Sequence, residues 1–390
     1  MIDTVVMTLR SWNFRIIDPD RFEPSARFIL NGSKPLGARG YFTAYQNPTK
    51  EEFRKGIYKP RLTLINRYDF NLKKRETSLR IELSIPKLLF GNNFDEVTFS
   101  DLTRSVELLR TGLANMSVAV SEYSIYHAPI SAIHYSKNIV LTDGTTTSYL
   151  LRKLKECNFK LPLDVNQADY RNEGHSYRWH CNSYEIVFYD KLKDLEIAKI
   201  SEKRTIEKDY QLQLNLNKTV RKTSPFEIIR LEARLNKRQK IRQDLKKINF
   251  PVDLIYKNLF NPEISRKILL KYIDEMAARR YPIIDYHPPN IEAMLSDLIV
   301  RNPNLGIKKA LQLIGLKQIL DSVPFRALRT MFNSYSKRSW YRLVSDAKKV
   351  NLPSVMSPFK IIRDHINQFK PVKLLDFQPQ MLNNDKYKLY

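Results

Sequence analysis

The chain has 390 residues, a length that favours two or three domains, and hydrophobic residues make up 43% of it, which is enough to bury a core and excludes a disordered chain. Sixty-six Lys and Arg residues against 41 Asp and Glu residues give a net charge of +25, which favours a polyanionic partner such as nucleic acid, although acidic lipid or a ribosome fits the charge as well. No segment approaches the roughly 18 uninterrupted apolar residues of a membrane span, and residues 1–7 lack the basic start of a signal peptide. Two cysteines are too few for a disulfide framework. A cytoplasmic protein is therefore expected.

The first part of the chain is predicted to mix strands and helices. Apolar, β-branched runs predict strands within residues 5–17, 61–66, 79–85, 130–141, 184–191 and 227–236. Apolar residues at helical spacing predict an amphipathic helix over residues 101–116, and residues 147–157 are predicted to form a basic helix. Because strands alternate with helices and no Gly-rich phosphate loop occurs, the expected fold class is α+β, with a central, mostly antiparallel sheet.

The pattern becomes helical from about residue 262. Helices are predicted over residues 264–280, 291–301, 306–320, 325–335 and 339–350. We therefore expect two domains, residues 1–260 and residues 261–390. Residues 336–345 resemble the recognition helix of a helix-turn-helix, in which Lys337 and Arg338 would face base edges and phosphates. A basic amphipathic helix that only packs explains the same residues.

Four predicted strands carry ionisable side chains among apolar neighbours. These side chains are Glu82, His134, Tyr189 with Lys191, and Glu232 between Arg230 and Arg234. Because side chains alternate along a strand, Tyr189 and Lys191 are expected on one face. Each residue also has an ordinary explanation: a strand Glu between arginines usually joins a surface salt-bridge ladder, a lone strand His is usually hydrogen-bonded scaffold, and most tyrosines pack.

Phosphodiester transesterification is the reaction that would need these residues together. A tyrosine hydroxyl has a pKa near 10 and is a weak nucleophile at neutral pH, and a nearby lysine such as Lys191 would favour its phenolate. Mg²⁺ or Mn²⁺ would neutralise charge on the scissile phosphate. Glu82 and Glu232, with His134 as a third ligand, would hold that ion if their strands are neighbours. A P-loop helicase is excluded because the GxxxxGK[ST] pattern is absent.

Six short stretches then occur in an order that runs along nearly the whole chain. They are Met-Ile-Asp at 1–3, Ile-Glu-Leu-Ser-Ile-Pro-Lys at 81–87 with its Leu-Leu-Phe-Gly-Asn continuation, Ile-Ser-Ala-Ile-His at 130–134, Val-Phe-Tyr-Asp-Lys at 187–191, Arg-Leu-Glu-Ala-Arg at 230–234, and Ser-Trp-Tyr-Arg-Leu-Val-Ser at 339–345. In this order they resemble the gene II replication endonuclease family of filamentous bacteriophages, and more distantly the rolling-circle initiators of small plasmids.

The resemblance implies roles for particular residues. The family's Tyr-x-Lys strand maps onto Tyr189 as nucleophile with Lys191, and its Arg-x-Glu-Ala-Arg strand maps onto residues 230–234. His134 stands where relatives carry an aspartate, and the His-hydrophobic-His signature of the wider nicking superfamily is absent. Tyr177 and Tyr184 lie close enough in sequence to be alternative nucleophiles.

The expected function is that of a phage replication initiator. Residues 1–260 would nick one strand of the double-stranded replicative form at the origin, start rolling-circle replication and rejoin the displaced single strand, and the resemblance implies a host helicase and DNA polymerase as partners. DNA contacts are assigned to Arg230 and Arg234, to Lys237, Arg238 and Lys240 of the basic run 236–242, and to Lys337 and Arg338 of the helical domain. The alternative is a non-catalytic origin-binding or repressor protein.

Overall fold

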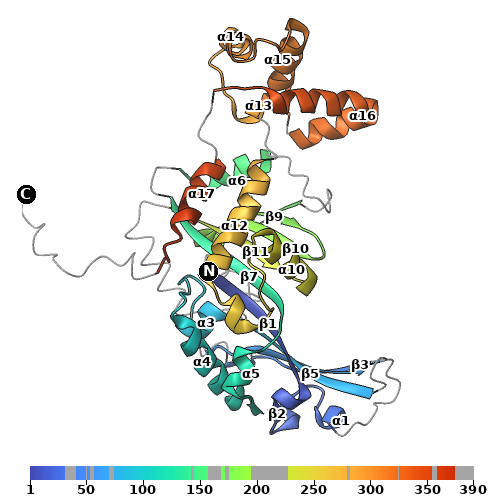
Figure 1. The fold of residues 1–390 in the computed structure, drawn as a ribbon, viewed down its shortest axis with the longest axis vertical. Helices are drawn as coiled ribbons and strands as arrows, with labels where there is room; N and C mark the ends of the chain where they lie inside the picture. The colour runs from blue at the N-terminus through green and yellow to red at the C-terminus, as the bar shows by residue number, and fades with distance from the viewer. Residues whose placement is uncertain are drawn as a thin grey trace, which may run out of the picture.

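The computed structural model describes residues 1–30, 41–49, 51–52, 57–69, 74–141, 145–156, 168–171, 175–194, 227–278, 282–323, 325–353 and 358–373. Within these residues the centre of the molecule is a nine-stranded antiparallel sheet (Figure 1). Across the sheet, the strands follow the order β3 (Tyr41–Gln46), β4 (Arg61–Asp69), β5 (Lys74–Ser84), β1 (Ile2–Arg10), β7 (Ile130–Leu141), β11 (Glu227–Leu235), β10 (Tyr184–Asp190), β9 (Ser176–His180) and β8 (Ala168–Arg171). The predicted α+β class with a large antiparallel sheet is confirmed.

The sheet has one apolar face, because its strands alternate between apolar and polar side chains. Val5 and Met7 of β1, Ile133 of β7, Leu231 of β11 and Phe188 of β10 all point to this face and have no exposed surface. Full burial of such a side chain contributes about 1.5–3 kcal/mol to stability, so this face fixes the register of every strand that crosses it.

The opposite face of the sheet, called the polar face below, carries the ionisable residues that the sequence singled out. Residues that pair across an antiparallel ladder share a face. The register places on it Tyr189 and Glu185 of β10, Arg230, Glu232 and Arg234 of β11, His134, Ser136 and Asn138 of β7, Thr4 of β1, and Arg80, Glu82 and Ser84 of β5.

Helices cover the apolar face. The helices α10 (Arg238–Lys247) and α12 (Pro262–Ala277) pack against β7 and β11, α6 (Thr147–Glu156) packs against β10, and α17 (Pro358–Gln368) lies beside α12 (Figure 1). Nearer β1 are α3 (Ile85–Phe90), α4 (Asp101–Asn115), α5 (Glu122–Tyr126) and α11 (Tyr256–Leu259). Short elements complete this part: α1 (Arg27–Leu30), the 3₁₀ turns η1 (Ser11–Asn13) and η2 (Pro19–Arg21), and a small sheet of β2 (Arg15–Ile16) with β6 (Val118–Ala119).

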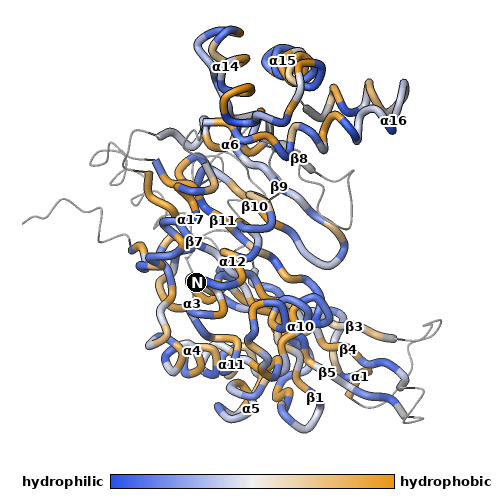
Figure 2. Tube along the Cα trace, turned by 45° about the horizontal axis from the view of Figure 1, so that its top comes forward, coloured by the Kyte–Doolittle hydropathy of each residue, from blue (hydrophilic) through white to orange (hydrophobic). Residues whose placement is uncertain are grey.

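A second hydrophobic core lies within residues 283–352. It joins α13 (Pro282–Asp285), α14 (Ile291–Arg301), α15 (Ile307–Ser322) and α16 (Phe325–Lys349), which gather at one end of the molecule in Figure 1. Orange and blue residues alternate along α16 in Figure 2, as expected of a helix that buries one face. The expected boundary near residue 260 falls before α12, whereas the two cores separate after it, since Ile264 and Ile268 of α12 pack in the sheet's core.

Two helices expected at 325–335 and 339–350 form the single element α16, whose backbone leaves the helical conformation at Ser336 (φ −154°, ψ 94°). Ser336 accepts a hydrogen bond from the backbone N–H of Ser339 at 3.4 Å, as an N-cap does, so a new helical segment begins at Lys337. Among the described helices of both cores, none is both long and apolar enough to span a membrane.

Candidate functional site

The strand register assembles a cluster of charged residues on the polar face. Tyr189 lies opposite Arg230 in the pairing of β10 with β11, and Glu232 lies opposite Val187. On the other side of β11, His134 lies opposite Arg234. The predicted residues Tyr189, Glu232, Arg230, Arg234 and His134 therefore meet on three adjacent strands.

Glu232 is the centre of this cluster. It is 3% exposed and accepts hydrogen bonds from the Tyr189 hydroxyl at 2.7 Å and from Arg230 Nε at 2.9 Å, both on Oε1. Its Oε2 accepts from Arg234 Nε at 2.8 Å and Nη2 at 2.7 Å. Both carboxylate oxygens are thus bound by charged or hydroxyl donors, which is how a buried carboxylate stays ionised.

Arg230 ties the cluster to the first strand. Its Nη2 donates to Asp3 Oδ1 at 2.6 Å and to Ser136 Oγ at 3.0 Å, while Nη1 donates to the carbonyl oxygen of Asn93 at 2.8 Å. Asp3 sits at an irregularity of the β1–β7 ladder between Ile2 and Thr4. The sequence reasoning missed Asp3 as a site residue, and its signal was an acid inside the apolar first strand.

The environment sets the ionisation of the cluster. Burial alone would raise the pKa of Glu232, but Arg234 and Arg230 hold it well below its usual range. Burial, together with the neighbouring Glu232 carboxylate, raises the pKa of Tyr189 well above its ordinary value of 10.0. The resting state is therefore a neutral phenol that donates to a carboxylate. Burial and then Arg234 also lower the pKa of His134, whose Nε2 lies 3.3 Å from Asn236 Oδ1.

Lys191 is placed differently from the prediction. The strand β10 ends at Asp190, and Lys191 opens a short helical turn, so it does not continue the alternation of the strand. Its Nζ lies 5.6 Å from the centroid of the Tyr189 ring, over the ring face, and the residue is fully buried. Lys191 thus contacts Tyr189 through the ring, while burial and Glu232 dominate the ionisation of the phenol.

The predicted metal set does not form one site. Glu82 lies on β5, which β1 and β7 separate from β11, so three inter-strand spacings place it about 14 Å across the sheet from Glu232. Glu82 instead pairs with Arg80 at 3.2 Å, the ordinary salt-bridge arrangement. Among the described residues no group of three His, Cys, Asp or Glu side chains is arranged to hold a metal ion. Glu82, Glu232 and His134 therefore do not fit a shared ion.

The two alternative tyrosines lie away from the cluster. Tyr184 and Tyr177 are 3% and 5% exposed and point to the apolar face, where Tyr184 stacks on Tyr272 and Tyr177 packs edge-on against Trp179. Tyr189 is the one of the three candidates whose hydroxyl lies on the polar face.

The residues assigned to DNA divide into exposed and buried ones. Lys237 and Arg238 are exposed beside the start of α10, and Lys337 and Arg338 are exposed beyond the break in α16. Lys240 is not available to DNA, because it points inward and its Nζ donates to the buried Asp244 at 2.9 Å. Arg230 is 2% exposed and bound to Glu232, so it is not available to DNA either, whereas the side chain of Arg234 keeps 32% of its surface exposed.

Comparisons of the chain with protein-family models, with curated proteins and with solved structures gave no match. The gene II resemblance therefore rests on the six stretches alone. Four of the residues in those stretches, Asp3, Tyr189, Arg230 and Glu232, are joined to one another by hydrogen bonds.

Proposed function

We propose that the chain is a replication initiator that nicks one strand of double-stranded DNA at an origin through Tyr189, and later rejoins the displaced strand. The observation that supports this most is the hydrogen bond from the Tyr189 hydroxyl to Glu232 beside two arginines. A nucleophilic hydroxyl, a proton acceptor and cationic groups for a phosphate are the parts that a transesterification needs.

In the proposed reaction the Tyr189 oxygen forms a bond to phosphorus, and the bond from phosphorus to the 3′ oxygen breaks. The leaving 3′ oxygen takes a proton from water, so the products are a 5′-phosphotyrosine and a free 3′-hydroxyl that primes synthesis. The phenol proton has one acceptor at hand, Glu232 Oε1 at 2.7 Å. Rejoining runs the same steps in reverse, with a 3′-hydroxyl attacking the phosphotyrosine.

Binding of a DNA phosphate would make Glu232 a better acceptor for the phenol proton. Arg234 is the partly exposed arginine of the cluster, so an incoming phosphate competes with Glu232 for its guanidinium. Losing that partner raises the pKa of Glu232 and makes it a better base. Arg230, held by Asp3, Ser136 and Glu232, keeps the carboxylate in place meanwhile.

The remaining parts of the proposal come from the resemblance and the charge. A divalent ion, Mg²⁺ or Mn²⁺, belongs to the proposed reaction, but Glu82, Glu232 and His134 do not form its site. The helical segment from Lys337 is proposed to read origin duplex, and a host helicase and DNA polymerase are the proposed partners.

A second function, a non-catalytic origin-binding or repressor protein, is favoured by one observation. A Glu232 neutralised by two arginines and a Tyr189 with a raised pKa are also what an inert buried ion network contains.

Removal of the Tyr189 hydroxyl separates the two functions. We expect Tyr189→Phe to form neither nicked circles nor a covalent DNA adduct with supercoiled plasmid carrying the origin, while its origin affinity stays within a few-fold. Tyr184→Phe is the matched control, since it removes a hydroxyl from the same strand on the other face. A Tyr189→Phe protein that still forms the adduct would show that another residue is the nucleophile, and a wild-type protein that binds but never nicks would support the second function.

A further inference from the structure

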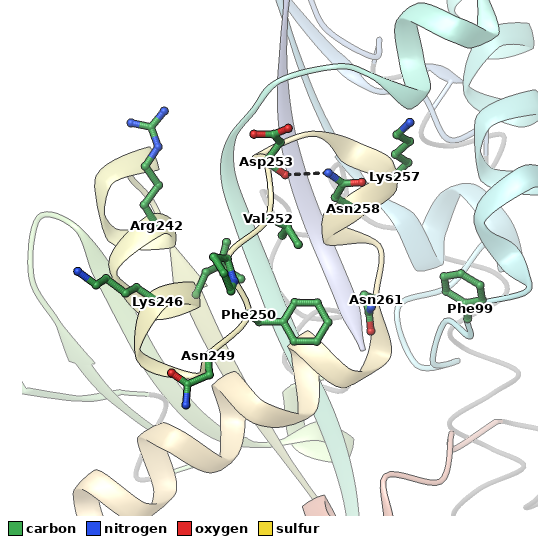
Figure 3. A pocket seen from close by; sticks show the side chains of 12 residues that line it. Phe99, Arg242, Lys246, Asn249, Phe250, Val252, Asp253, Lys257, Asn258 and Asn261 are labelled. Carbon is green, nitrogen blue, oxygen red and sulfur yellow. Dashed lines mark hydrogen bonds between the residues drawn. The ribbon is translucent and has the colours of Figure 1, made fainter.

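A large pocket lies on the side of the sheet opposite Tyr189. It has a volume of about 1180 Å³ and is bordered by α10, by the segment 249–261 and by Phe99. Figure 3 shows Arg242, Lys246 and Asn249 on one side, the 253–261 segment on the other, and the Phe250 ring between them. Pockets for small molecules measure roughly 300–1,000 Å³, so this one suits a longer, extended ligand.

The end of α10 builds the pocket. Asn249 adopts a left-handed conformation with φ 55°, which asparagine tolerates better than most residues. The N–H of Phe250 donates to the carbonyl of Leu245 at 2.9 Å and the N–H of Asn249 to that of Lys246 at 3.2 Å, the paired bonds of a Schellman motif. The chain therefore reverses at Asn249 and lays Phe250 across the base of the helix, and Pro251 follows as a helix stop.

The walls of the pocket combine aromatic, amide and cationic groups with one carboxylate, that of the exposed Asp253. Phe99 is 59% exposed, and Phe250 is half-buried with Lys267 Nζ 5.4 Å from its ring centroid. Asn249, Asn258 and Asn261 line it as well. Within the part of the chain that the structure describes, Arg242 and Lys246 are exposed and make no ion pair.

The positive charge continues from the pocket along α10. The exposed positions of this helix include Arg238, Arg242, Lys246 and Lys247, whereas its one acid, Asp244, is buried and bound by Lys240 and Lys271. The solvent face of α10 is therefore entirely basic or neutral, and it leads into the aromatic pocket.

We propose that this pocket binds single-stranded DNA, as a second DNA site separate from the Tyr189 cluster. Phosphates would contact Arg242 and Lys246, and unpaired bases would stack on Phe250 and Phe99, because a basic groove with aromatic rings is how proteins hold single strands without sequence preference. A duplex offers no free base faces to such rings. The choice of DNA as ligand rests on the proposed function, in which a displaced strand must be held until it is rejoined.

The test measures binding of a fluorescein-labelled oligothymidylate to the full chain by anisotropy, with a chelator present so that no cutting occurs. We expect Phe250→Leu to raise Kd about tenfold, since base stacking is lost while most of the packing stays. Arg242→Gln and Lys246→Gln should each flatten the slope of log K against log salt by about 0.7. Lys247→Gln removes a charge from the same helix outside the pocket lining, where Lys247 pairs with Glu275 at 3.6 Å, and should change Kd less than about twofold.

Phe250 contacts the core, so circular dichroism checks the fold of Phe250→Leu, and the two exposed cation variants keep the test decisive if that variant is destabilised. Equal Kd values for the pocket variants and Lys247→Gln overturn the proposal, as does a pocket that binds poly-glutamate in preference to oligothymidylate. Plasmid nicking by the wild type is scored separately. If the wild type nicks but the pocket variants bind oligothymidylate like wild type, the pocket proposal is wrong and the proposed function stands. If the pocket variants bind more weakly but the wild type does not nick, the proposed function is wrong and the pocket proposal stands.

Discussion

Replacing Glu232 with glutamine tests whether the charged cluster is a single cooperative unit. The carboxylate accepts four hydrogen bonds, from the Tyr189 hydroxyl, from Arg230 Nε and from two nitrogens of Arg234, at 2.7–2.9 Å. Glutamine keeps the shape but brings an NH₂ group, which faces a donor whichever way the amide turns. The change therefore leaves the guanidinium groups of Arg230 and Arg234 without the carboxylate that neutralises them.

The size of the effect follows from what the arginines retain. Breaking a buried ion pair by removing one partner costs about 3–5 kcal/mol. Arg230 still has Asp3 at 2.6 Å, and Arg234 still has Glu185 at 3.4 Å. These remaining acids offset part of the loss, so we expect the free energy of unfolding to fall by about 3 kcal/mol, at the lower end of that range.

Urea unfolding followed by circular dichroism measures this loss. The matched control is Glu185→Gln, whose carboxylate is 20% exposed and pairs with Arg178 and Arg234 at 3.5 and 3.4 Å, and which should cost about 1 kcal/mol or less. A Glu232→Gln protein within about 1 kcal/mol of wild type, or a control that loses as much, would refute the reasoning that the cluster depends on this carboxylate.

Three further predictions concern pH, the second core and DNA reading. Because the pKa of Glu232 is depressed in the folded state, its carboxylate contributes fully to stability above the unfolded pKa of about 4.3, and this contribution is lost as the pH falls below that value. Between about pH 6 and about pH 3 the urea midpoint should therefore drop more for wild type than for Glu232→Gln. Equal drops would contradict this prediction. Trp340 is 2% exposed in the core of α14–α16, so Trp340→Ala should cost about 3–5 kcal/mol and lower one calorimetric transition; an equal loss in the sheet's transition would show that the two cores unfold together. Replacing Lys337 and Arg338 with alanine should lower discrimination between origin and random duplex by about 1–3 kcal/mol per lost base contact, whereas replacing Lys237 and Arg238 should weaken both duplexes alike and flatten the salt slope; titrations of both duplexes at several salt concentrations decide between these roles.

Several regular elements could be predicted because their hydrophobic period is strong, whereas the strands β3, β8 and β9 and the helix α17 were not predicted. The strand expected over residues 130–141 is β7, Ile130–Leu141, and the helix expected over 101–116 is α4, Asp101–Asn115. The helix α10 was not predicted as a helix. Two of its four buried positions are Lys240 and Asp244, so the inward face of this helix lacks the apolar stripe that reveals an amphipathic helix.

The site could be predicted only in its residue types. Alternation along a strand placed Tyr189 on one face of β10, but the order of strands across the sheet is not written in any one strand. It is this order that joins Glu232 to Asp3 through Arg230 and separates Glu82 from Glu232. Burial of Lys240 and Arg230 could not be read from charge, because a basic run looks the same whether a given side chain meets solvent or a buried carboxylate.

The central position of β1 has a consequence for how the protein is made. Asp3 and Arg230 are 227 positions apart in the chain, yet they form one hydrogen bond at the centre of the sheet. At roughly 5–20 residues per second of synthesis, the first strand waits about 11–45 s on the ribosome for its partner in β11. Until β11 is made, the edge of β7 that later pairs with it stays unpaired and is open to association with other chains. Slow, non-local pairing of this kind makes yield sensitive to temperature and to chaperone supply.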